Sequence, residues 1–316
     1  MKDNYQGFHR PVLNDEVIDF LALYHAGVYV DATIGAGGHA EALLEHTGPK
    51  AFLVGIDRDA AVLKLCTKRL SRFKERLQII HGAFADYASI IHEAGVTKVN
   101  AVLLDLGMSS VQVNDPQRGF SFLRTGPLDM RMDQRQGMTA ETIVNEYAPA
   151  DLERIFLDYG EERYAKRIAR FLVSERKKYR IRNTTELAEL IKQAVPAACR
   201  SGRIHPATRV FQAIRMEVNQ EMKQLKTALN HVAESLMEGG RMAVISFHSL
   251  EDRQVKDFIF NQSRGCVCPA NFPFCVCGKK PLLKMVTKKA VRPSAREIIE
   301  NPRARSARMR VAEKVA

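Results

Sequence analysis

The sequence predicts an α/β fold built on a parallel sheet, and three observations support this prediction. Four apolar, strand-like runs alternate with segments of helical periodicity within the first 105 residues, which is typical of a parallel sheet covered by helices on both faces. A glycine-rich turn follows the first run, and three of the four runs end in an aspartate. Because ligands bind beyond the carboxyl ends of such strands, we expect the functional site there.

The elements follow one another in a regular order along the chain. Strands are expected at residues 28–31, 51–57, 77–81, 100–105 and 241–247. Helices are expected between the first four strands, at residues 40–45, 60–73 and 87–94. The fifth strand lies far from the fourth in the sequence, so we expect an insertion between them.

The turn after the first strand has the form D-x-x-x-G-x-G-G, with Asp31 followed by Gly35, Gly37 and Gly38. Glycines there let the backbone approach a ligand closely. Asp57 ends the second strand, where a carboxylate can accept hydrogen bonds from both ribose hydroxyls of a nucleoside. The pattern departs from G-x-G-x-x-G, and an acid near the turn suits a ligand that carries an ammonium group. The turn therefore favours S-adenosylmethionine over a dinucleotide, with a plain βαβ crossover as the alternative.

The stretch between the fourth and fifth strands has three parts. Residues 106–138 are rich in Gly, Ser, Pro and Asp, but their aromatic and methionine content argues against disorder. From residue 139 to about 198 the periodicity is purely helical, and Thr139 and Asn183 are expected N-caps. Residues 208–238 predict one long amphipathic helix that packs in the core and leads to the fifth strand.

The charge balance favours a polyanionic partner, with a generic soluble basic protein as the alternative. The chain holds 48 Lys and Arg against 36 Asp and Glu, a net charge of +12, which says nothing about fold. The densest basic run, residues 163–182, has nine Lys or Arg and one Glu. This run is either a nucleic-acid contact or a solvated helix face. Residues 302–312 alternate basic and apolar types and predict a strand whose arginines contact phosphate or solvent.

The sequence has no feature of membrane insertion or export. No apolar run approaches the roughly 18 residues that a spanning helix needs, and the N-terminal residues lack the apolar segment of a signal peptide. We therefore expect a cytoplasmic protein with no membrane partner and with reduced thiols.

Four of the six cysteines form a cluster with the pattern C-x-C-x6-C-x-C: Cys266, Cys268, Cys275 and Cys277. Four thiols can bind zinc tetrahedrally. A spacing of one residue is tighter than the usual two to four, because neighbouring thiolates must both turn inward. A zinc site, reduced surface thiols and an occasional disulfide are the alternatives.

Three residues near strand ends are candidates for the chemistry. Phe84 follows the third strand and either lines an adenine pocket or is an ordinary core aromatic. Asp105 begins Asp-Leu-Gly-Met, where amino-group methyltransferases carry an Asp/Asn-Pro-Pro-aromatic loop; its carboxylate suits an exocyclic amine or the cofactor. His248 follows the fifth strand and is either a proton acceptor or a structural histidine.

Eight sequence strings, in order along nearly the whole chain, resemble those of one family, the bacterial 16S ribosomal RNA (cytosine-N4)-methyltransferases, also called the RsmH or MraW family. These strings are His9–Glu16, Asp31–His39, Gly119–Phe122, Gly126–Met132, Tyr159–Arg163, His205–Arg209, Ser246–Asp252 and Asn301–Ser306. The resemblance implies S-adenosylmethionine-dependent methylation of the N4 amine of a cytosine in the decoding centre. The implied partner is 16S ribosomal RNA within the small ribosomal subunit, and a homodimer stays open.

The resemblance also implies a domain organisation. A class I, Rossmann-like methyltransferase domain is expected at residues 1–138 and 208–316. An all-helical domain inserted at residues 139–207 is expected to help hold RNA.

Carried over residue by residue, the resemblance implies a set of site residues. The cofactor site comprises Gly37, Gly38 and His39 in the first turn with Gly35, Asp57 at the ribose, Phe84 at the adenine, and Asp105 and Gln112 from the fourth-strand loop. Asp105 and His248 are the catalytic candidates. Some members of the family carry the four cysteines and others do not, so no catalytic metal is expected.

Two other readings of the sequence compete with an RNA methyltransferase. A nicotinamide-dependent oxidoreductase would share Asp57 and the turn, but the third glycine is out of place and no Tyr-x-x-x-Lys pair is present. A non-catalytic RNA-binding or ribosome-assembly factor could have the same methyltransferase fold. The aspartates at the strand ends argue against this alternative.

Overall fold

The computed structural model describes residues 11–202, 204–266, 268–269, 272, 274 and 276–315. The chain divides into two compact units. The first combines Met1–Gly107 with Lys223–Ala316, and the second is Met108–Met222. Each unit is described by itself below.

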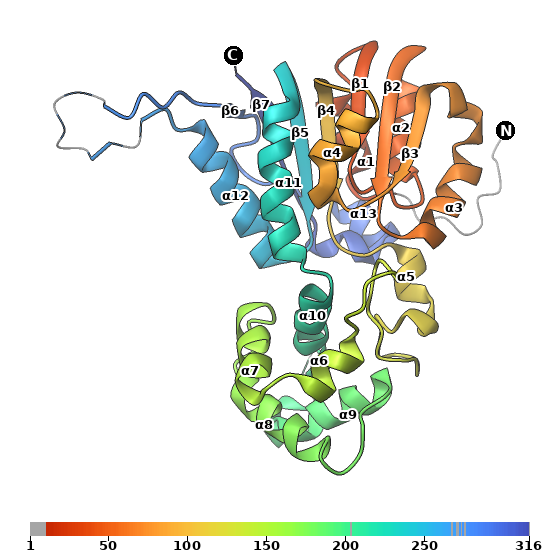
Figure 1. Cartoon of the computed structure of the whole chain (residues 1–316), viewed down its shortest axis with the longest axis vertical. Helices are drawn as coiled ribbons and strands as arrows, with labels where there is room; N and C mark the ends of the chain where they lie inside the picture. Colours follow the sequence, from red (N-terminus) through yellow and green to blue (C-terminus); the bar gives the residue numbers. More distant parts are fainter. Residues whose placement is uncertain are drawn as a thin grey trace. The chain divides into compact units, whose positions relative to one another are not determined.

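The first unit is built on a seven-stranded sheet with the order β3-β2-β1-β4-β5-β7-β6 (Figure 1). The strands are β1 Ala26–Asp31, β2 Lys50–Asp57, β3 Leu77–His81, β4 Val99–Asp105, β5 Leu236–Ser246, β6 Leu283–Met285 and β7 Arg308–Lys314. β1 to β5 pair in parallel, and β7 lies antiparallel between β5 and β6. The predicted α/β class and all five predicted strands are confirmed.

Helices cover both faces of this sheet, as the alternating pattern predicts. One hydrophobic cluster joins the sheet to α1, α2 and α3, and another joins it to α4, α11 and α12. Figure 1 shows α4, α11 and α12 together on one side of the strands. The helices are α1 Asn14–Leu21, α2 Gly38–His46, α3 Ala60–Arg69, α4 Tyr87–Glu93, α11 Glu221–Ser235, α12 Ser249–Ser263 and α13 Ala295–Glu300.

The parallel register brings the strand ends to one edge of the sheet. Asp31 pairs with Gly55 of β2 and with Leu103 of β4, so β1 ends two residues before the last residue of each neighbouring strand. β2 ends at Asp57 and β4 at Asp105. We call Asp31, Asp57 and Asp105 the strand-end acids.

The second unit is helical and has its own hydrophobic core. Its helices are α5 Ser110–Asn114, α6 Ala140–Glu146, α7 Pro149–Asp158, α8 Ala165–Glu175, α9 Thr184–Ala194 and α10 Ala207–Val218. The two predicted N-caps are confirmed: the side chain of Thr139 accepts from the Thr142 N–H, and that of Asn183 accepts from the Glu186 N–H. In the described part of the chain, no helix is long and apolar enough to span a membrane.

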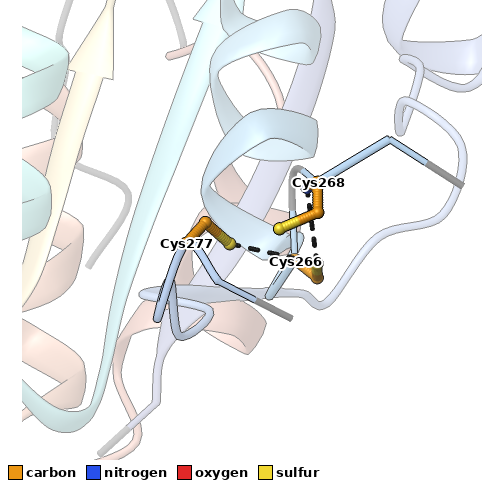
Figure 2. Close-up of side chains that lie close together, drawn as sticks. All are labelled: Cys266, Cys268 and Cys277. Carbon is orange, nitrogen blue, oxygen red and sulfur yellow. Dashed lines mark hydrogen bonds between the residues drawn. The ribbon is translucent and has the colours of Figure 1, made fainter. Parts of the chain in front are cut away.

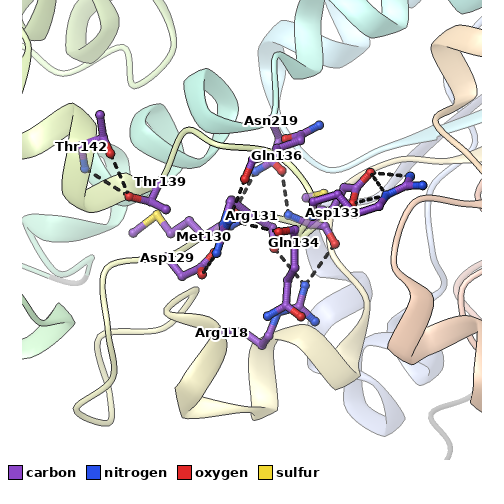
Figure 3. Close-up of polar contacts among 12 residues, drawn as sticks. Arg118, Asp129, Met130, Arg131, Asp133, Gln134, Gln136, Thr139, Thr142 and Asn219 are labelled. Carbon is purple, nitrogen blue, oxygen red and sulfur yellow. Dashed lines mark hydrogen bonds and ion pairs between the residues drawn. The ribbon is translucent and has the colours of Figure 1, made fainter.

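The second unit is wider than the expected insertion of residues 139–207, because flanking segments pack into its core. Met130 and Met132, from the segment before the first long helix, are buried in the core together with Phe211 and Ile214 of α10. The same segment is ordered by polar contacts (Figure 3). Arg118 donates to the carbonyl oxygens of residues 131 and 132 at 2.9 and 3.1 Å.

The single long helix expected at residues 208–238 is wrong. The chain forms α10 and α11 instead, and Asn219 ends the first of them. The Asn219 side chain donates to the Met130 carbonyl at 2.8 Å and accepts from the Met132 N–H at 2.9 Å (Figure 3). Gln220 then adopts a left-handed φ of 48°. Side-chain hydrogen bonds to a distant segment override a helical pattern that continues in sequence.

The C-terminal strand is confirmed as β7, and two of its arginines pair with a carboxylate of the same unit. Arg308 donates to the Asp252 carboxylate at 2.9 Å, and Arg310 donates to the same carboxylate at 2.7 and 3.2 Å. These two arginines lower the pKa of Asp252 despite its burial. These ion pairs link β7 to α12, and a contact of the arginines with phosphate stays a prediction.

Candidate active site

The three glycines of the turn between β1 and α2 differ in the space that surrounds each of them. Gly35 has a φ of +53°, and a Cβ there would meet nothing nearer than 3.7 Å. At Gly37, with a φ of +83°, a Cβ would lie 2.9 Å from a side-chain carbon of Leu70. At Gly38 it would lie 2.5 Å from Cγ of Pro11. Protein packing therefore requires Gly37 and Gly38, and Gly35 is the position that leaves open space for a ligand.

The carboxylate of Asp57, at the end of β2, accepts a hydrogen bond from this turn. Its Oδ2 accepts a hydrogen bond from the Gly35 N–H at 3.0 Å, and its Oδ1 accepts one from the Asp59 N–H at 2.9 Å. Burial raises the pKa of Asp57, and the two N–H donors oppose this shift. A carboxylate has about four acceptor positions, so Asp57 retains the capacity to accept from ribose hydroxyls.

The other two strand-end acids lie in an environment that disfavours negative charge. Asp31 is 1% exposed. Burial raises its pKa to about 7, and the charge of Asp57 adds to the shift, against a hydrogen bond from the Thr33 N–H. The pKa of Asp105 is raised well above its ordinary value, first by burial and then by the charges of Asp31 and Glu251. A positively charged ligand nearby would favour the ionised form of both acids.

Asp105 also presents a buried acceptor atom toward this site. Its Oδ1 is buried and has no hydrogen-bond partner among the described residues, while its own N–H donates to Thr33 Oγ1 at 2.6 Å. A buried polar atom without a partner costs about 1–3 kcal/mol. The position therefore suits an N–H or O–H donor that a ligand supplies. Sequence reasoning missed Thr33, which supports both Asp31 and Asp105 from within the first turn.

His39 lies next to Asp105 at the start of α2. Its Nε2 donates to the Val12 carbonyl at 2.8 Å, and its Nδ1 lies 3.6 Å from Asp105 Oδ2, which is too long for a direct hydrogen bond. Burial lowers the pKa of His39 to about 4. The imidazole is therefore neutral at pH 7, and with Nε2 protonated its Nδ1 is an acceptor that faces the site.

Phe84 is part of the hydrophobic core on the α4 face and is 9% exposed. The guanidinium of Arg58 lies over its ring, 5.9 Å from the centroid, within the range of a cation–π contact. The structure therefore confirms that Phe84 is a core aromatic. Its contact with adenine stays a prediction.

His248 is held by the start of α12. Its Nδ1 accepts from the Glu251 N–H at 3.4 Å, which makes it the N-cap of the helix, and its Nε2 lies 3.1 Å from Glu251 Oε1. Glu251 Oε2 in turn accepts from the Phe247 N–H at 2.9 Å. Sequence reasoning missed Glu251, although its position three residues after His248 is the spacing of a capping box.

Gln112 belongs to the second unit and is described within it. Gln112 is the N3 residue of α5 and forms a capping box with Ser109. The Ser109 hydroxyl accepts from the Gln112 N–H at 3.2 Å, and the Gln112 side chain accepts from the Ser109 N–H at 3.0 Å. Its part in a cofactor site stays a prediction.

The basic run of the second unit separates into two groups. Some residues make internal contacts: Arg176 donates to two carbonyl oxygens at 2.7 and 2.8 Å, and Arg180 pairs with Glu141 and Glu146. The other group lies on α8. Lys166, Arg167 and Arg170 are exposed on one side of this helix, whose buried positions are Ala165, Ile168, Ala169 and Leu172. In the described part of the chain, none of these three cations forms an ion pair. We call them the α8 basic face.

Comparison with known proteins identifies the family. The family model described as the MraW methylase family matches residues 6–315. The chain belongs to this methylase family. It is 46% identical to Ribosomal RNA small subunit methyltransferase H of Halothermothrix orenii, over 97% of this chain and 98% of that one. It is 49% identical to the protein of the same name from Carboxydothermus hydrogenoformans, over 98% of both chains.

Membership of the MraW methylase family makes the chain a methyltransferase, so the oxidoreductase alternative is wrong. A solved rRNA methylase from Streptococcus thermophilus covers 96% of this chain and 94% of its own, with a TM-score of 0.41 and 10% identity. That likeness is too low to add to the argument. The family assignment thus rests on the sequence, and the site rests on the geometry of the strand-end acids.

Proposed function

We propose that this methyltransferase transfers a methyl group from S-adenosylmethionine to the exocyclic N4 amine of a cytosine in the decoding centre of 16S ribosomal RNA. One structural observation supports the proposal above the others: the strand-end acids lie at one edge of the sheet, beside a turn that is open at Gly35. The names of the curated relatives place their substrate in small-subunit ribosomal RNA.

The residues present fit this cofactor. Asp57 is held by two backbone N–H groups and can accept from the ribose hydroxyls. Asp31, buried and close to the charge of Asp57, suits the ammonium group of the methionine portion. When bound, S-adenosylmethionine supplies an electrophilic methyl group on a sulfonium centre whose leaving group departs neutral. The open side of Gly35 lets the ligand contact the backbone directly.

Within this proposal, Asp105 accepts a hydrogen bond from the amine that is methylated. A nucleobase amine is a poor nucleophile because its lone pair is delocalised into the ring, so an acceptor for its proton assists the reaction. The unpartnered Oδ1 of Asp105 can accept that N–H. His248 is the second candidate, and its two ring nitrogens already face the backbone N–H and the carboxylate of Glu251. Within the described ranges, His248 Nε2 is buried without a hydrogen-bond partner, as Asp105 Oδ1 is. Because Nδ1 accepts from the Glu251 N–H, a neutral His248 carries its proton on Nε2 and has no second acceptor nitrogen, which favours Asp105 for the acceptor role and His248 for positioning α12.

The proposed RNA contact is the α8 basic face. Three exposed cations on one helical face, without internal ion pairs, attract phosphate groups through charge alone. The remaining alternative, a non-catalytic RNA-binding factor on the same shell, predicts RNA binding without transfer.

One experiment tests the proposed reaction and substrate together. Purified small ribosomal subunits from a strain that lacks this activity are incubated with the protein and labelled S-adenosylmethionine, and the modified nucleoside is identified by mass spectrometry. The Asp105→Ala variant is the matched control, and protein-free 16S RNA is the second substrate. N4-methylated cytidine with the wild-type protein supports the proposal. Saturable cofactor and RNA binding with no transfer to either substrate would support the non-catalytic alternative.

A further inference from the structure

Three cysteines beyond the end of α12 come together, at a place that the methyl-transfer site does not use. The Sγ atoms of Cys266, Cys268 and Cys277 all lie within 4.8 Å of one another, and Figure 2 shows the three side chains close together, with dashed lines from Cys268 and Cys277 to Cys266. Cys275, the fourth cysteine of the sequence pattern, lies outside the described residues. The inference below rests on the three described thiols and is independent of the proposed function.

We propose that Cys266, Cys268 and Cys277 bind a divalent cation of the Zn²⁺ type as thiolates and that this ion closes the loop between α12 and β6. Each thiol releases its proton to solvent when it ligates, since a metal-bound thiol is deprotonated. The site is structural: it lies on an exposed loop, and no group of the methyl-transfer site is among its ligands.

The distances favour a metal site over a disulfide. Cys266 Sγ and Cys277 Sγ are 3.9 Å apart. A disulfide bond is about 2.0 Å long. Two thiolates on a tetrahedral Zn²⁺ with bonds of about 2.3 Å have their sulfur atoms about 3.8 Å apart. The observed separation, which is that of a hydrogen bond between the two thiols, also matches that of two ligands of one ion.

Backbone hydrogen bonds add a second, independent observation. The Cys268 N–H points to Cys266 Sγ at 3.4 Å, and the Val276 N–H points to Cys268 Sγ at 3.4 Å. Hydrogen bonds to the charged form of a group favour that form, and such outer contacts orient the ligands of a metal.

The chemistry of the ligands indicates the class of ion. Soft thiolates select zinc, cuprous copper and iron–sulfur clusters over magnesium and calcium. Three thiols are three-quarters of the usual ligand set of a structural zinc site. The base of the loop is already closed by a hydrogen bond from the Leu282 N–H to the Gln262 carbonyl at 2.8 Å, and the Lys279 ammonium donates to the Asn261 carbonyl at 2.6 Å. An ion held by Cys266 and Cys277 would add a link farther out along this loop, next to Val276, which is 73% exposed.

The test measures metal directly on the full-length protein. Protein purified under reducing conditions and stripped with a chelator is titrated with Co²⁺, whose thiolate charge-transfer absorption reports sulfur ligation, and then with Zn²⁺ as competitor. We expect one equivalent of Co²⁺ with strong charge-transfer absorption, displaced by one equivalent of Zn²⁺. Cys266→Ser and Cys277→Ser should each weaken binding more than about 100-fold, because loss of even an outer partner of a metal site costs about 10–100-fold. Cys199→Ser, a cysteine of the second unit, is the matched control and should bind as wild type.

A second readout separates a structural site from adventitious binding. Trypsin can cleave the loop after Arg264, Lys279 or Lys280, and Zn²⁺ should slow cleavage at these positions in the wild-type protein but not in Cys266→Ser. Circular dichroism verifies that each variant is folded. Co²⁺ binding that is equal in wild type and Cys266→Ser would overturn the proposal, and so would a wild-type protein that binds no Co²⁺ after full reduction.

Discussion

The strand-end acids and the α8 basic face are both groups of three charged residues, yet their surroundings give them opposite properties. Asp31 is 1% exposed and has a pKa near 7, whereas Lys166, Arg167 and Arg170 are exposed to solvent. Buried charges interact strongly with each other and with the ligand, because little water screens them. Exposed charges are screened within about 10 Å at 0.1 M salt.

We therefore expect the strand-end acids to act in cofactor binding and methyl transfer, and the α8 basic face to act in RNA binding. The strand-end acids gain specificity from fixed hydrogen bonds such as those on Asp57, and a single substitution there should have a large effect. The α8 basic face acts through summed charge, so its effect should be smaller and should depend on salt. Substitutions in the two groups should therefore differ in the size and in the salt dependence of their effects.

Removal of the Asp57 carboxylate should have the largest effect. Hydrogen bonds to a charged group are worth about 1.5–3 kcal/mol each, so Asp57→Ala should weaken S-adenosylmethionine binding more than about 100-fold by isothermal calorimetry. Because Asp57 also accepts from the Gly35 N–H, Asp57→Ala should lower the unfolding temperature as well. Asp57→Asn keeps one carbonyl acceptor and should stay closer to wild type in unfolding temperature while still losing affinity. Unchanged affinity in Asp57→Asn would contradict the ribose assignment.

Substitution of Asp105 should slow methyl transfer more than it changes RNA affinity. Proton acceptors of this kind typically contribute about 100-fold or more, so Asp105→Asn should reduce the single-turnover rate about 100-fold with nearly unchanged RNA binding. His248→Ala is the matched comparison and should have a smaller effect, because the His248 Nδ1 already accepts from the Glu251 N–H. A larger loss in His248→Ala than in Asp105→Asn would reverse the assignment of the acceptor.

Charge reversal on the α8 basic face should have an intermediate effect that depends on salt. Exposed ion pairs are worth up to about 1 kcal/mol each, so Arg167→Glu with Arg170→Glu should weaken RNA binding about 10-fold at low salt. The slope of log affinity against log salt should fall by about 1.4, at about 0.7 per lost contact. Lys64→Glu with Lys68→Glu, two exposed positions of α3, changes net charge equally. An equal loss in this control would assign the effect to net charge.

The smallest effect should be a pH dependence of cofactor affinity. Asp31 has a pKa of about 7 in the unliganded protein, so its carboxylate forms as pH rises and binds a cationic group better. We expect affinity to rise about fourfold from pH 6.5 to 8 and then level off, and Asp31→Asn should show a flat profile over the same range. A wild-type profile that is flat would show that Asp31 does not face the ligand's positive charge.

The same pKa predicts the opposite sign for stability. The folded protein holds the Asp31 proton more tightly than the unfolded chain, whose ordinary value is 3.8. The free energy of unfolding of the unliganded protein should therefore fall as pH rises from 3.8 toward about 7 and change little above it, as far as this group contributes. Thermal unfolding across this range, with Asp31→Asn as the reference, measures the contribution.

Much of the fold and part of the site follow from local sequence patterns. Apolar runs of strand length, separated by helical periodicity, predicted β1 to β5 because their burial is set by residue type and spacing alone. The aspartates that end β1, β2 and β4 could be recognised because each directly follows an apolar run in the sequence. The N-caps Thr139 and Asn183 were visible because a cap involves residues only three positions apart.

Properties that depend on distant segments could not be predicted. The break between α10 and α11 depends on hydrogen bonds from Asn219 to residues 130 and 132, which lie in another part of the chain. Arg308 and Arg310 were expected to contact phosphate or solvent, and the carboxylate that binds them is Asp252, more than fifty residues earlier. No local pattern contains such partners.

Local residue patterns were enough to predict the order of strands and helices, the acids at the strand ends and the family, because these features depend on short-range periodicity and on residue identity. The tertiary structure alone decided which glycine is open, which acid carries a raised pKa and which cations are unpaired. Gly35 and Gly38 are the same residue type three positions apart, but only Gly38 has Pro11 against it. Packing sets what surrounds a side chain, and the surroundings set its charge and its access to ligands.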